Sequence, residues 1–249
     1  MSKEWFENWF DSPYYHILYK NRDDREAKAF IDALLRHLGP SAQANILDLA
    51  CGKGRFSRHL AQKGFDVTGL DLSSNSIDYA RRYEQENLSF FQHDMRRPFR
   101  TNYFDYIFSF FTSFGYFDTD EEHLQTLQAI RQGLRPNGVL VLDFFNSTYV
   151  KNQLLGEEEK VLDGIRFKIK KWVDDTSVFK TIQFEDQGTA YTFTEQVRLF
   201  SLDDFRQLFR VASIEIVGTF GNYQLAPFRQ QESPRLILVG KPYDRTTTT

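Results

Sequence analysis

The sequence predicts an α/β fold in which a mostly parallel sheet carries helices on both faces and a small antiparallel β meander is inserted late in the chain. Two observations support this prediction. Over residues 41–150, short apolar runs alternate with segments whose apolar residues have helical spacing, a pattern typical of parallel strands joined by right-handed crossovers. Over residues 165–199, apolar and polar residues alternate one by one, which indicates antiparallel strands with one face in water.

The first 40 residues are expected to be helical. Within residues 25–38, apolar side chains recur at helical spacing and form one stripe, which should pack on the sheet. Gly39 and Pro40 then end the helix. The stripe consists of Phe30, Ile31, Leu34, Leu35 and Leu38.

The first strand of the alternating region leads into a glycine turn. Residues 45–49 form an apolar strand that carries Asp48 near its end. Gly52 and Gly54 follow, and glycines let the backbone turn tightly and approach a ligand closely. Residues 55–61 have apolar side chains at helical spacing, so free N–H groups of a helix N-terminus should face the same crevice. This combination is typical of a loop that holds a cofactor.

The next two strands also end in a carboxylate. Residues 65–71 end at Asp71, at a distance from the glycines that suits an acid accepting hydrogen bonds from two ribose hydroxyls. Residues 88–95 place Asp94 beside Met95, so that a carboxylate could accept from an adenine amino group while the methionine packs on the ring. Each acid has an alternative role as a turn former or helix cap, and that alternative would have to hold at three strand ends in succession.

The rest of the chain supplies the remaining elements of the expected fold. Further strands of the main sheet are predicted over residues 106–111, 139–144, 214–218 and 236–240, with helices over 121–134 and 203–211. The meander strands are predicted over residues 165–172, 178–184 and 191–199.

These acids and glycines, in this order, resemble the motifs of class I S-adenosylmethionine-dependent methyltransferases. The motifs are residues 48–54, Asp71, residues 93–95 and residues 104–109, and the resemblance covers residues 40–150 well and the rest loosely. It implies a Rossmann-like, seven-stranded, mostly parallel sheet and S-adenosyl-L-methionine as the cofactor. It also implies the residues that bind this cofactor, namely Asp48, Ala50, Gly52 and Gly54 at the methionine part, Asp71 and Leu72 at the ribose, Asp94 and Met95 at the adenine, and Phe110 near the sulfonium.

A nicotinamide dinucleotide is the alternative ligand, and an oxidoreductase the corresponding alternative function. Gly52, Gly54 and Ser57 are spaced as G-x-G-x-x-S, one residue short of the dinucleotide fingerprint. A pyrophosphate needs a helix N-terminus that is open to an anion. Asp48, just before the turn, is better suited to a cation such as the amino end of a methionine moiety, which favours the methyl donor.

The resemblance implies a methyltransferase acting on a small-molecule acceptor with an N or O nucleophile by in-line displacement. In the family an N-terminal segment often covers the cofactor, which makes Tyr15 and Tyr19 candidates for a lid, with surface packing as the alternative. Tyr116 is a further candidate for the acceptor site. The sequence assigns no catalytic residue, because orientation alone can account for much of such a reaction. A methyltransferase-like binding module that retains the cofactor without an acceptor is the second functional hypothesis.

Glu195 and Arg198 are the acceptor-site candidates within the meander. Glu195 shares a face with apolar neighbours by period two, and a carboxylate turned inward there needs a partner. It could bind an amine or hydroxyl of the acceptor. Alternatively, it could pair with Arg198 or with a lysine of the adjacent strand.

Composition limits the class of protein. A chain of 249 residues suits one main domain, divided into a helical lid region (1–40), a cofactor-binding core (41–150), an antiparallel insertion on the acceptor side (151–200) and a C-terminal helix with the last strands (201–243).

The net charge of −3 disfavours a nucleic-acid partner. No signal peptide, membrane span or metal-ligand spacing is apparent, so we expect a cytoplasmic monomer or homodimer. Cys51 is the only cysteine, and its place in the glycine turn indicates a requirement for a small residue.

Overall fold

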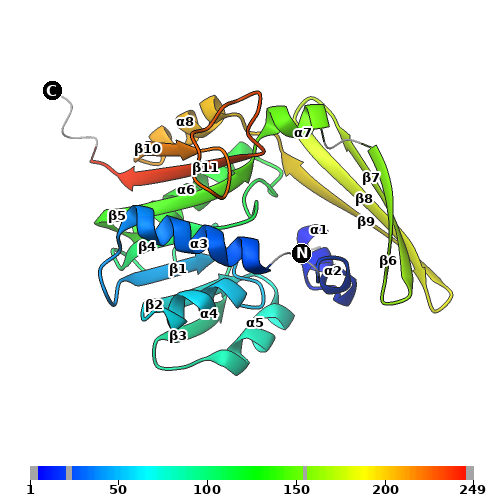
Figure 1. Ribbon diagram of the computed structural model, residues 1–249, viewed down its shortest axis with the longest axis horizontal. Coiled ribbons are helices and arrows are strands. Elements are labelled where there is room, and N and C mark those ends of the chain that lie inside the picture. Colours follow the sequence, from blue (N-terminus) through cyan, green and yellow to red (C-terminus); the bar gives the residue numbers. More distant parts are fainter. Residues whose placement is uncertain (1–4, 21–23, 154–155, 245–249) are drawn as a thin grey trace.

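A seven-stranded sheet lies at the centre of the structure, a computed structural model that describes residues 5–20, 24–153 and 156–244 (Figure 1). The strand order is β10-β11-β5-β4-β1-β2-β3, and β11 runs antiparallel to both of its neighbours. The predicted Rossmann-like, mostly parallel sheet is thereby confirmed. The strands are β1 (Asn45–Leu49), β2 (Asp66–Asp71), β3 (Leu88–Gln92), β4 (Phe104–Ser109), β5 (Leu134–Phe145), β10 (Ile214–Phe220) and β11 (Arg235–Pro242).

Helices cover both faces of this sheet, and alternate strand residues point to the two faces. On one face, α3 (Asp24–Leu38), α4 (Arg55–Gln62) and α5 (Ser74–Ala80) pack on a buried cluster that includes Ile46 and Val67. On the other face, α6 (Asp120–Gly133) and α8 (Leu202–Val211) pack on Leu47, Leu140 and their neighbours. A short 3-10 turn (Arg81–Tyr83) follows α5, and α7 (Ser147–Gln153) follows β5. Among the described residues, no helix has the length and apolar character needed to span a bilayer.

A separate four-stranded antiparallel sheet forms the predicted insertion. Its strands, in order, are β6 (Gly156–Leu162), β7 (Ile165–Val173), β8 (Ser177–Asp186) and β9 (Thr189–Arg198). The sequence predicted only the last three. β6 carries a run of charged residues that hides any alternation, and cross-strand ion pairs such as Lys170 with Glu157 and Lys171 with Glu158 hold it on β7.

Two short N-terminal helices, α1 (Trp5–Phe10) and α2 (Pro13–Leu18), lie between the two sheets (Figure 1). They pack on the inner face of the four-stranded sheet, where Trp9 and Leu18 join a buried cluster with Phe167 and Ile182. Edge-to-face ring contacts also connect α1 to the segment after β4, for example Phe6 with Phe117 at 5.8 Å between centroids. The N-terminal helices therefore connect the insertion to the carboxyl edge of the central sheet.

Local signals at helix and strand ends were predicted with mixed success. Ser73 caps α5, with its hydroxyl accepting a hydrogen bond from the backbone N–H of Ser76. Capping boxes begin α6 at Thr119 and α8 at Ser201. β5 begins at Leu134 rather than at the predicted residue 139, because Leu134 already pairs with Phe104 of β4 across a register shift.

Replacing Gly54 with alanine tests whether this glycine is required by packing. Gly54 has a φ of 73°, and a Cβ atom there would lie 2.4 Å from Cζ of Phe90. We expect Gly54→Ala to lower the free energy of unfolding by about 2 to 4 kcal/mol, because overpacking adds to left-handed strain. Urea denaturation measures the loss.

The matched control is Gly64→Ala. Gly64 has a φ of 94°, but an added Cβ would meet nothing within 4 Å. Only backbone strain applies there, so a loss of about 1 kcal/mol is expected. Equal losses at the two positions would contradict the packing explanation.

Candidate functional site

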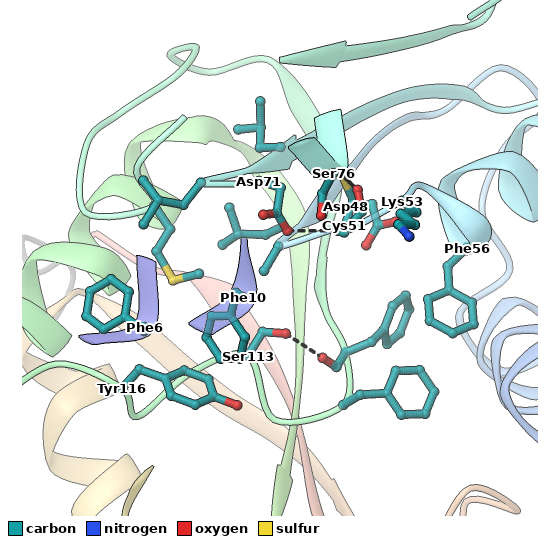
Figure 2. Close-up of a pocket in the computed structure, with 18 of the residues that line it drawn as sticks. Phe6, Phe10, Asp48, Cys51, Lys53, Phe56, Asp71, Ser76, Ser113 and Tyr116 are labelled. Carbon is teal, nitrogen blue, oxygen red and sulfur yellow. Dashed lines mark hydrogen bonds between the residues drawn. The ribbon is translucent and has the colours of Figure 1, made fainter. Parts of the chain in front are cut away.

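A cavity of about 380 Å³ opens at the carboxyl ends of β1, β2 and β4, in the size range of small-molecule sites (Figure 2). Its floor is the edge of the central sheet, where ligands bind in open α/β sheets. Its cover comes from α1, α2 and the segment after β4. Eleven of the predicted site residues line it: Asp48, Ala50, Gly52, Asp71, Leu72, Asp94, Met95, Phe110, Tyr15, Tyr19 and Tyr116. Gly54, Glu195 and Arg198 do not.

The glycine turn after β1 presents its backbone to the cavity at one glycine only. Gly52 lines the cavity with a φ of 55°, and an added Cβ would meet no protein atom within 4 Å. A ligand can therefore approach this part of the backbone closely. Gly54 lies outside the cavity lining and against Phe90, which gives this glycine a packing role, and its predicted part in cofactor binding stays a prediction. Cys51 is buried beside the turn, and burial raises the pKa of its thiol, which fits a small packing residue rather than a nucleophile.

Asp48 is a buried carboxylate with little compensation. It is 1% exposed, and it accepts a hydrogen bond of 2.6 Å from the hydroxyl of Ser57. Burial raises its pKa to about 6, and the negative charge of Asp71 contributes in the same direction. A cationic group bound in the cavity would offset this cost.

Asp71 is held at the end of β2 by two backbone donors. The N–H of Gly52 donates to Oδ2 at 2.8 Å, and the N–H of Ser73 donates to Oδ1 at 2.9 Å. Burial raises the pKa of this carboxyl group. Each carboxylate oxygen can accept a further hydrogen bond, and Figure 2 shows the side chain beside the glycine turn. The geometry suits a pair of hydroxyl donors.

Asp94 lines the cavity but is already engaged. Its oxygens accept hydrogen bonds from the backbone N–H of Arg96 at 2.9 Å and from the guanidinium of Arg96 at 2.8 to 3.1 Å. Burial acts to raise its pKa, but the hydrogen bonds from Arg96 outweigh it and the pKa is lowered. Arg96 also binds Glu122 at 2.7 Å, which fixes the pair against α6. The carboxylate thus has less free acceptor capacity than the sequence implied.

Glu195 lies on the inner face of β9, and its contacts are those of the structural alternative. Its Oε1 accepts from Nε1 of Trp9 at 2.7 Å and from the hydroxyl of Tyr19 at 2.6 Å. Its other oxygen lies 3.9 Å from Nζ of Lys180, a lysine of the adjacent strand. Lys180 also donates to the hydroxyl of Tyr19. We call Trp9, Tyr19, Lys180 and Glu195 the lid anchor, because they hold the N-terminal helices on the four-stranded sheet.

Arg198 is also corrected. Its Nη2 lies 3.0 Å from Oδ1 of Asp120, at the start of α6, so it braces the insertion against the core rather than lining the cavity. The contacts of Glu195 and of Arg198 could not be predicted for the same reason: in both cases the partner residues lie far away along the chain.

Several cavity residues were not singled out from the sequence. Aromatic side chains from α1 and from the segment after β4 form much of the wall, and ring contacts such as Phe10 with Tyr116, at 5.2 Å between centroids, join the two segments. Lys53 and Arg55 place cations beside the glycine turn. His16 contributes an imidazole whose pKa is lowered to about 4, first by burial and then by the charge of Lys53. Only the spacing around Gly52 could have indicated Lys53 and Arg55; nothing local places α1 over this cavity.

Comparison with known proteins gives a consistent result. Residues 46–138 match the family model of the methyltransferase domain. The chain is 35% identical over 187 residues to YqeM of Bacillus subtilis (strain 168), covering 70% of this chain and 74% of that protein. It is 33% identical over 236 residues to the dTDP-3-amino-3,4,6-trideoxy-alpha-D-glucopyranose N,N-dimethyltransferase of Streptomyces venezuelae, covering 92% of this chain and 96% of that protein.

The fold is shared with solved structures. The crystal structure of a S-adenosylmethionine-dependent methyltransferase from Clostridium acetobutylicum ATCC 824 superposes with a TM-score of 0.78 at 20% identity. The superposition covers 95% of this chain and 99% of that chain, so the insertion belongs to the shared architecture.

Neutralising Asp48 should stabilise the protein in a pH-dependent way. Because the folded-state pKa is about 6 against an ordinary 3.8, ionising Asp48 costs stability as the pH rises from about 4 to about 6. A pKa difference of one corresponds to about 1.36 kcal/mol. The free energy of unfolding of Asp48→Asn should therefore exceed that of the wild type by about 3 kcal/mol above pH 7 and by almost nothing below pH 4. Urea titrations at a series of pH values measure this difference.

Asp105→Asn is the control of opposite sign. Burial acts to raise the pKa of Asp105, but hydrogen bonds from the Asn45 backbone and from Arg135 outweigh it and the pKa is lowered. This variant should therefore lose stability relative to the wild type as the pH rises through the titration range of Asp105. An Asp48→Asn gain that does not change with pH would contradict the assigned pKa shift.

Proposed function

The chain belongs to the S-adenosylmethionine-dependent methyltransferases, and from this membership we propose that it transfers a methyl group to the amino group of a small molecule held between the central sheet and the N-terminal helices. The observation that carries the proposal is the meeting of two sets of residues in one cavity. Asp48, Gly52 and Asp71 line its sheet side, and an aromatic wall lines its lid side. A donor and an acceptor can thus be enclosed together.

The residues on the sheet side fit the cofactor. When bound, S-adenosylmethionine supplies a methyl group that its sulfonium already activates. The proposed contacts are the ribose hydroxyls at Asp71, whose oxygens two backbone N–H groups hold in place, and the positive amino end at Asp48. Lys53 and Arg55, the cations beside the turn, are placed to pair with a carboxylate. The adenine would lie near Asp94 and Met95.

The contacts of Ser57 argue against a dinucleotide. In the dinucleotide fingerprint the third position lets the helix pack closely on the strand, while the helix N-terminus receives the pyrophosphate. Here Ser57 is 0% exposed and donates its hydroxyl to Asp48, so a buried carboxylate lies beneath the helix N-terminus. A negative charge in this place disfavours an anionic ligand.

An amino acceptor is favoured by two observations. The relative from Streptomyces venezuelae, which this chain matches over 92% of its length, is named for the N,N-dimethylation of an amino sugar. The lid side of the cavity is rich in rings, and aromatic faces attract amines that carry methyl groups and positive charge. These rings belong to Phe6, Phe10, Tyr15, Tyr19, Tyr116 and Phe117.

The chain's contribution to the reaction is alignment and exclusion of water. The lone pair of a neutral amine would form a bond to the methyl carbon as the carbon–sulfur bond breaks, releasing S-adenosylhomocysteine, and the methylated ammonium would then lose a proton to water. Because the attack must be in line with the carbon–sulfur bond, the chain has to hold the two groups in one geometry. Orientation of this kind supplies about 7 to 11 kcal/mol in favourable cases. In this proposal α1 and α2 act as the lid, whereas α3, which also lies in the predicted lid region 1–40, belongs to the core. The insertion, predicted over residues 151–200 as the acceptor side, supports the lid and does not itself line the cavity. The cytoplasmic location and the monomeric or homodimeric state expected from the sequence stay predictions.

Transfer of a labelled methyl group tests the proposal. Purified protein is incubated with methyl-labelled S-adenosylmethionine and a panel of amino sugars and small amines, each paired with the matching hydroxyl compound. We expect label on amines only. Label on hydroxyl compounds alone would overturn the amino acceptor, and cofactor binding without transfer to any compound would favour the binding module.

Asp71→Asn should weaken binding of S-adenosylhomocysteine at least tenfold by calorimetry, about 1.4 kcal/mol, whereas Asp105→Asn should not.

Tyr19→Phe tests whether the lid anchor closes the cavity. The substitution removes a hydroxyl that donates to Glu195 and accepts from Lys180. We expect faster amide exchange over residues 5–19 and a KM for the acceptor raised at least fivefold, because charge-assisted hydrogen bonds contribute about 1.5 to 3 kcal/mol each.

Tyr14→Phe is the matched control. The hydroxyl of Tyr14 also joins α2 to the four-stranded sheet, donating to Asp186 at 2.9 Å, but Tyr14 does not line the cavity. Its loss should loosen the helix end without raising the KM. A similar KM for both variants would reject the role assigned to the lid anchor.

A further inference from the structure

The cavity wall after β4 contains two consecutive non-glycine residues in the left-handed conformation. Phe111 has a φ of 58° and Thr112 a φ of 61°. Such backbone costs about 1 to 3 kcal/mol per residue, and it is a clear outlier for a β-branched side chain such as threonine. Residues 110–113 all line the cavity, so the unusual backbone forms its surface.

Buried groups behind the cavity hold this turn. The N–H of Phe111 donates to Oδ2 of Asp143 at 2.8 Å, and the N–H of Thr112 donates to the main-chain oxygen of Asp143 at 3.0 Å. Nη2 of Arg235 donates to the hydroxyl oxygen of Thr112 at 2.9 Å. Each of the two strained residues therefore has its backbone N–H bound to Asp143.

Asp143 and Arg235 are themselves fixed. Nε and Nη2 of Arg235 lie 2.8 and 2.7 Å from Oδ1 of Asp143, whose side chain is 0% exposed. The hydroxyl of Tyr223 donates to Oδ2 of Asp143 at 3.3 Å, and its ring packs against Phe111 with centroids 5.5 Å apart. Asp143 lies on β5, Arg235 begins β11, and Tyr223 lies in the connection between β10 and β11. None of the three lines the cavity.

We propose that Asp143, Tyr223 and Arg235 form a clamp that positions the turn of residues 110–113, and that this turn sets the alignment of acceptor and methyl donor. The proposal rests on the proposed methyl transfer and adds positioning residues to it. Without the clamp, Phe111 and Thr112 relax toward negative φ and the wall moves. Transfer is sensitive to such movement, because a misplacement of about 1 Å can cost on the order of a hundredfold in rate.

A purely structural role is the alternative, in which the ion pair only joins β5 to β11. The two roles differ in what a weakened clamp changes. A structural role lowers the stability of the whole protein. The clamp changes the exchange of two particular amides and the turnover number.

The first test is Arg235→Met, which keeps the aliphatic stem and removes the guanidinium. We expect faster hydrogen exchange at the amides of Phe111 and Thr112, a kcat lowered at least tenfold, and an affinity for S-adenosylhomocysteine within about threefold of the wild type. Arg135→Met is the control, because Arg135 forms an ion pair of 2.8 Å with Asp105 outside the cavity. Unchanged exchange at both amides, or an equal loss of kcat in the control, would overturn the proposal.

Removing the guanidinium leaves a buried carboxylate unpaired and can prevent folding. A second pair of variants avoids this. Thr112→Val removes the oxygen that Arg235 binds, and Thr112→Ser keeps it. The clamp requires kcat to fall at least fivefold further in the valine variant than in the serine variant, with faster exchange at the two amides in the valine variant only. Equal kcat values would reject it. If the wild type transfers no methyl group, the proposed function fails, while the amide exchange still tests whether the clamp holds the turn.

Discussion

The placing of three carboxylates, two buried and one partly buried, at the carboxyl edge of the central sheet is the constraint that organises this structure. Asp48 and Asp143 are each 1% exposed and Asp71 is partly buried, and a carboxylate withdrawn from water must find donors. Each finds them in a different part of the cavity wall. Asp48 binds the hydroxyl of Ser57 in α4, Asp71 binds the backbone of the glycine turn and of the segment after β2, and Asp143 binds the turn after β4. Satisfying these charges therefore fixes the shape of the cavity.

The lid side of the cavity depends on a second constraint, the burial of an aromatic cluster between two separate sheets. The N-terminal helices pack their rings on the four-stranded sheet, where Trp9 is 1% exposed. They contact the central core through rings of the segment after β4 and through Asp11, which accepts hydrogen bonds from Ser73 and Asn75 at the start of α5. Edge contacts between rings are weaker than a continuous core. The polar contacts of Glu195 with Trp9 and Tyr19 add direction to this packing. The helices are thus fixed both to the insertion and to the cofactor side, which suits a cover for the cavity.

The sequence was sufficient where a local run of residues determines the outcome. Asp48, Asp71 and Asp94 were placed correctly at the cavity because each follows a short apolar run and the carboxyl ends of parallel strands meet at one edge. It was insufficient where a tertiary neighbour decides. Gly54 serves Phe90, which lies on another strand, and Glu195 finds its donors 186 and 176 residues away in Trp9 and Tyr19. Likewise, Arg235 is 92 residues from Asp143, and no spacing pattern connects them. β6 was missed for a different reason: its run of charged side chains shows no alternation of apolar and polar residues, although its backbone pairs with β7.

Several energetically unfavourable features lie together at the cavity. Over much of the molecule, local and tertiary preferences agree: capping boxes begin α6 and α8, and apolar clusters fill both faces of the sheet. Left-handed non-glycine residues also occur in turns outside the cavity, for example at Gln43, Asn102 and Ser213. At the cavity local and tertiary preferences conflict. Asp48 is a buried carboxylate that accepts a hydrogen bond from one side chain. Ala50, Phe111 and Thr112 adopt left-handed backbone conformations although none of them is glycine. Proteins retain such costs where function requires them, and other elements must then hold the strained parts in place. In this molecule the anchoring elements are β5 and β11, which lets a stable sheet edge support a cavity surface that would not keep its shape alone.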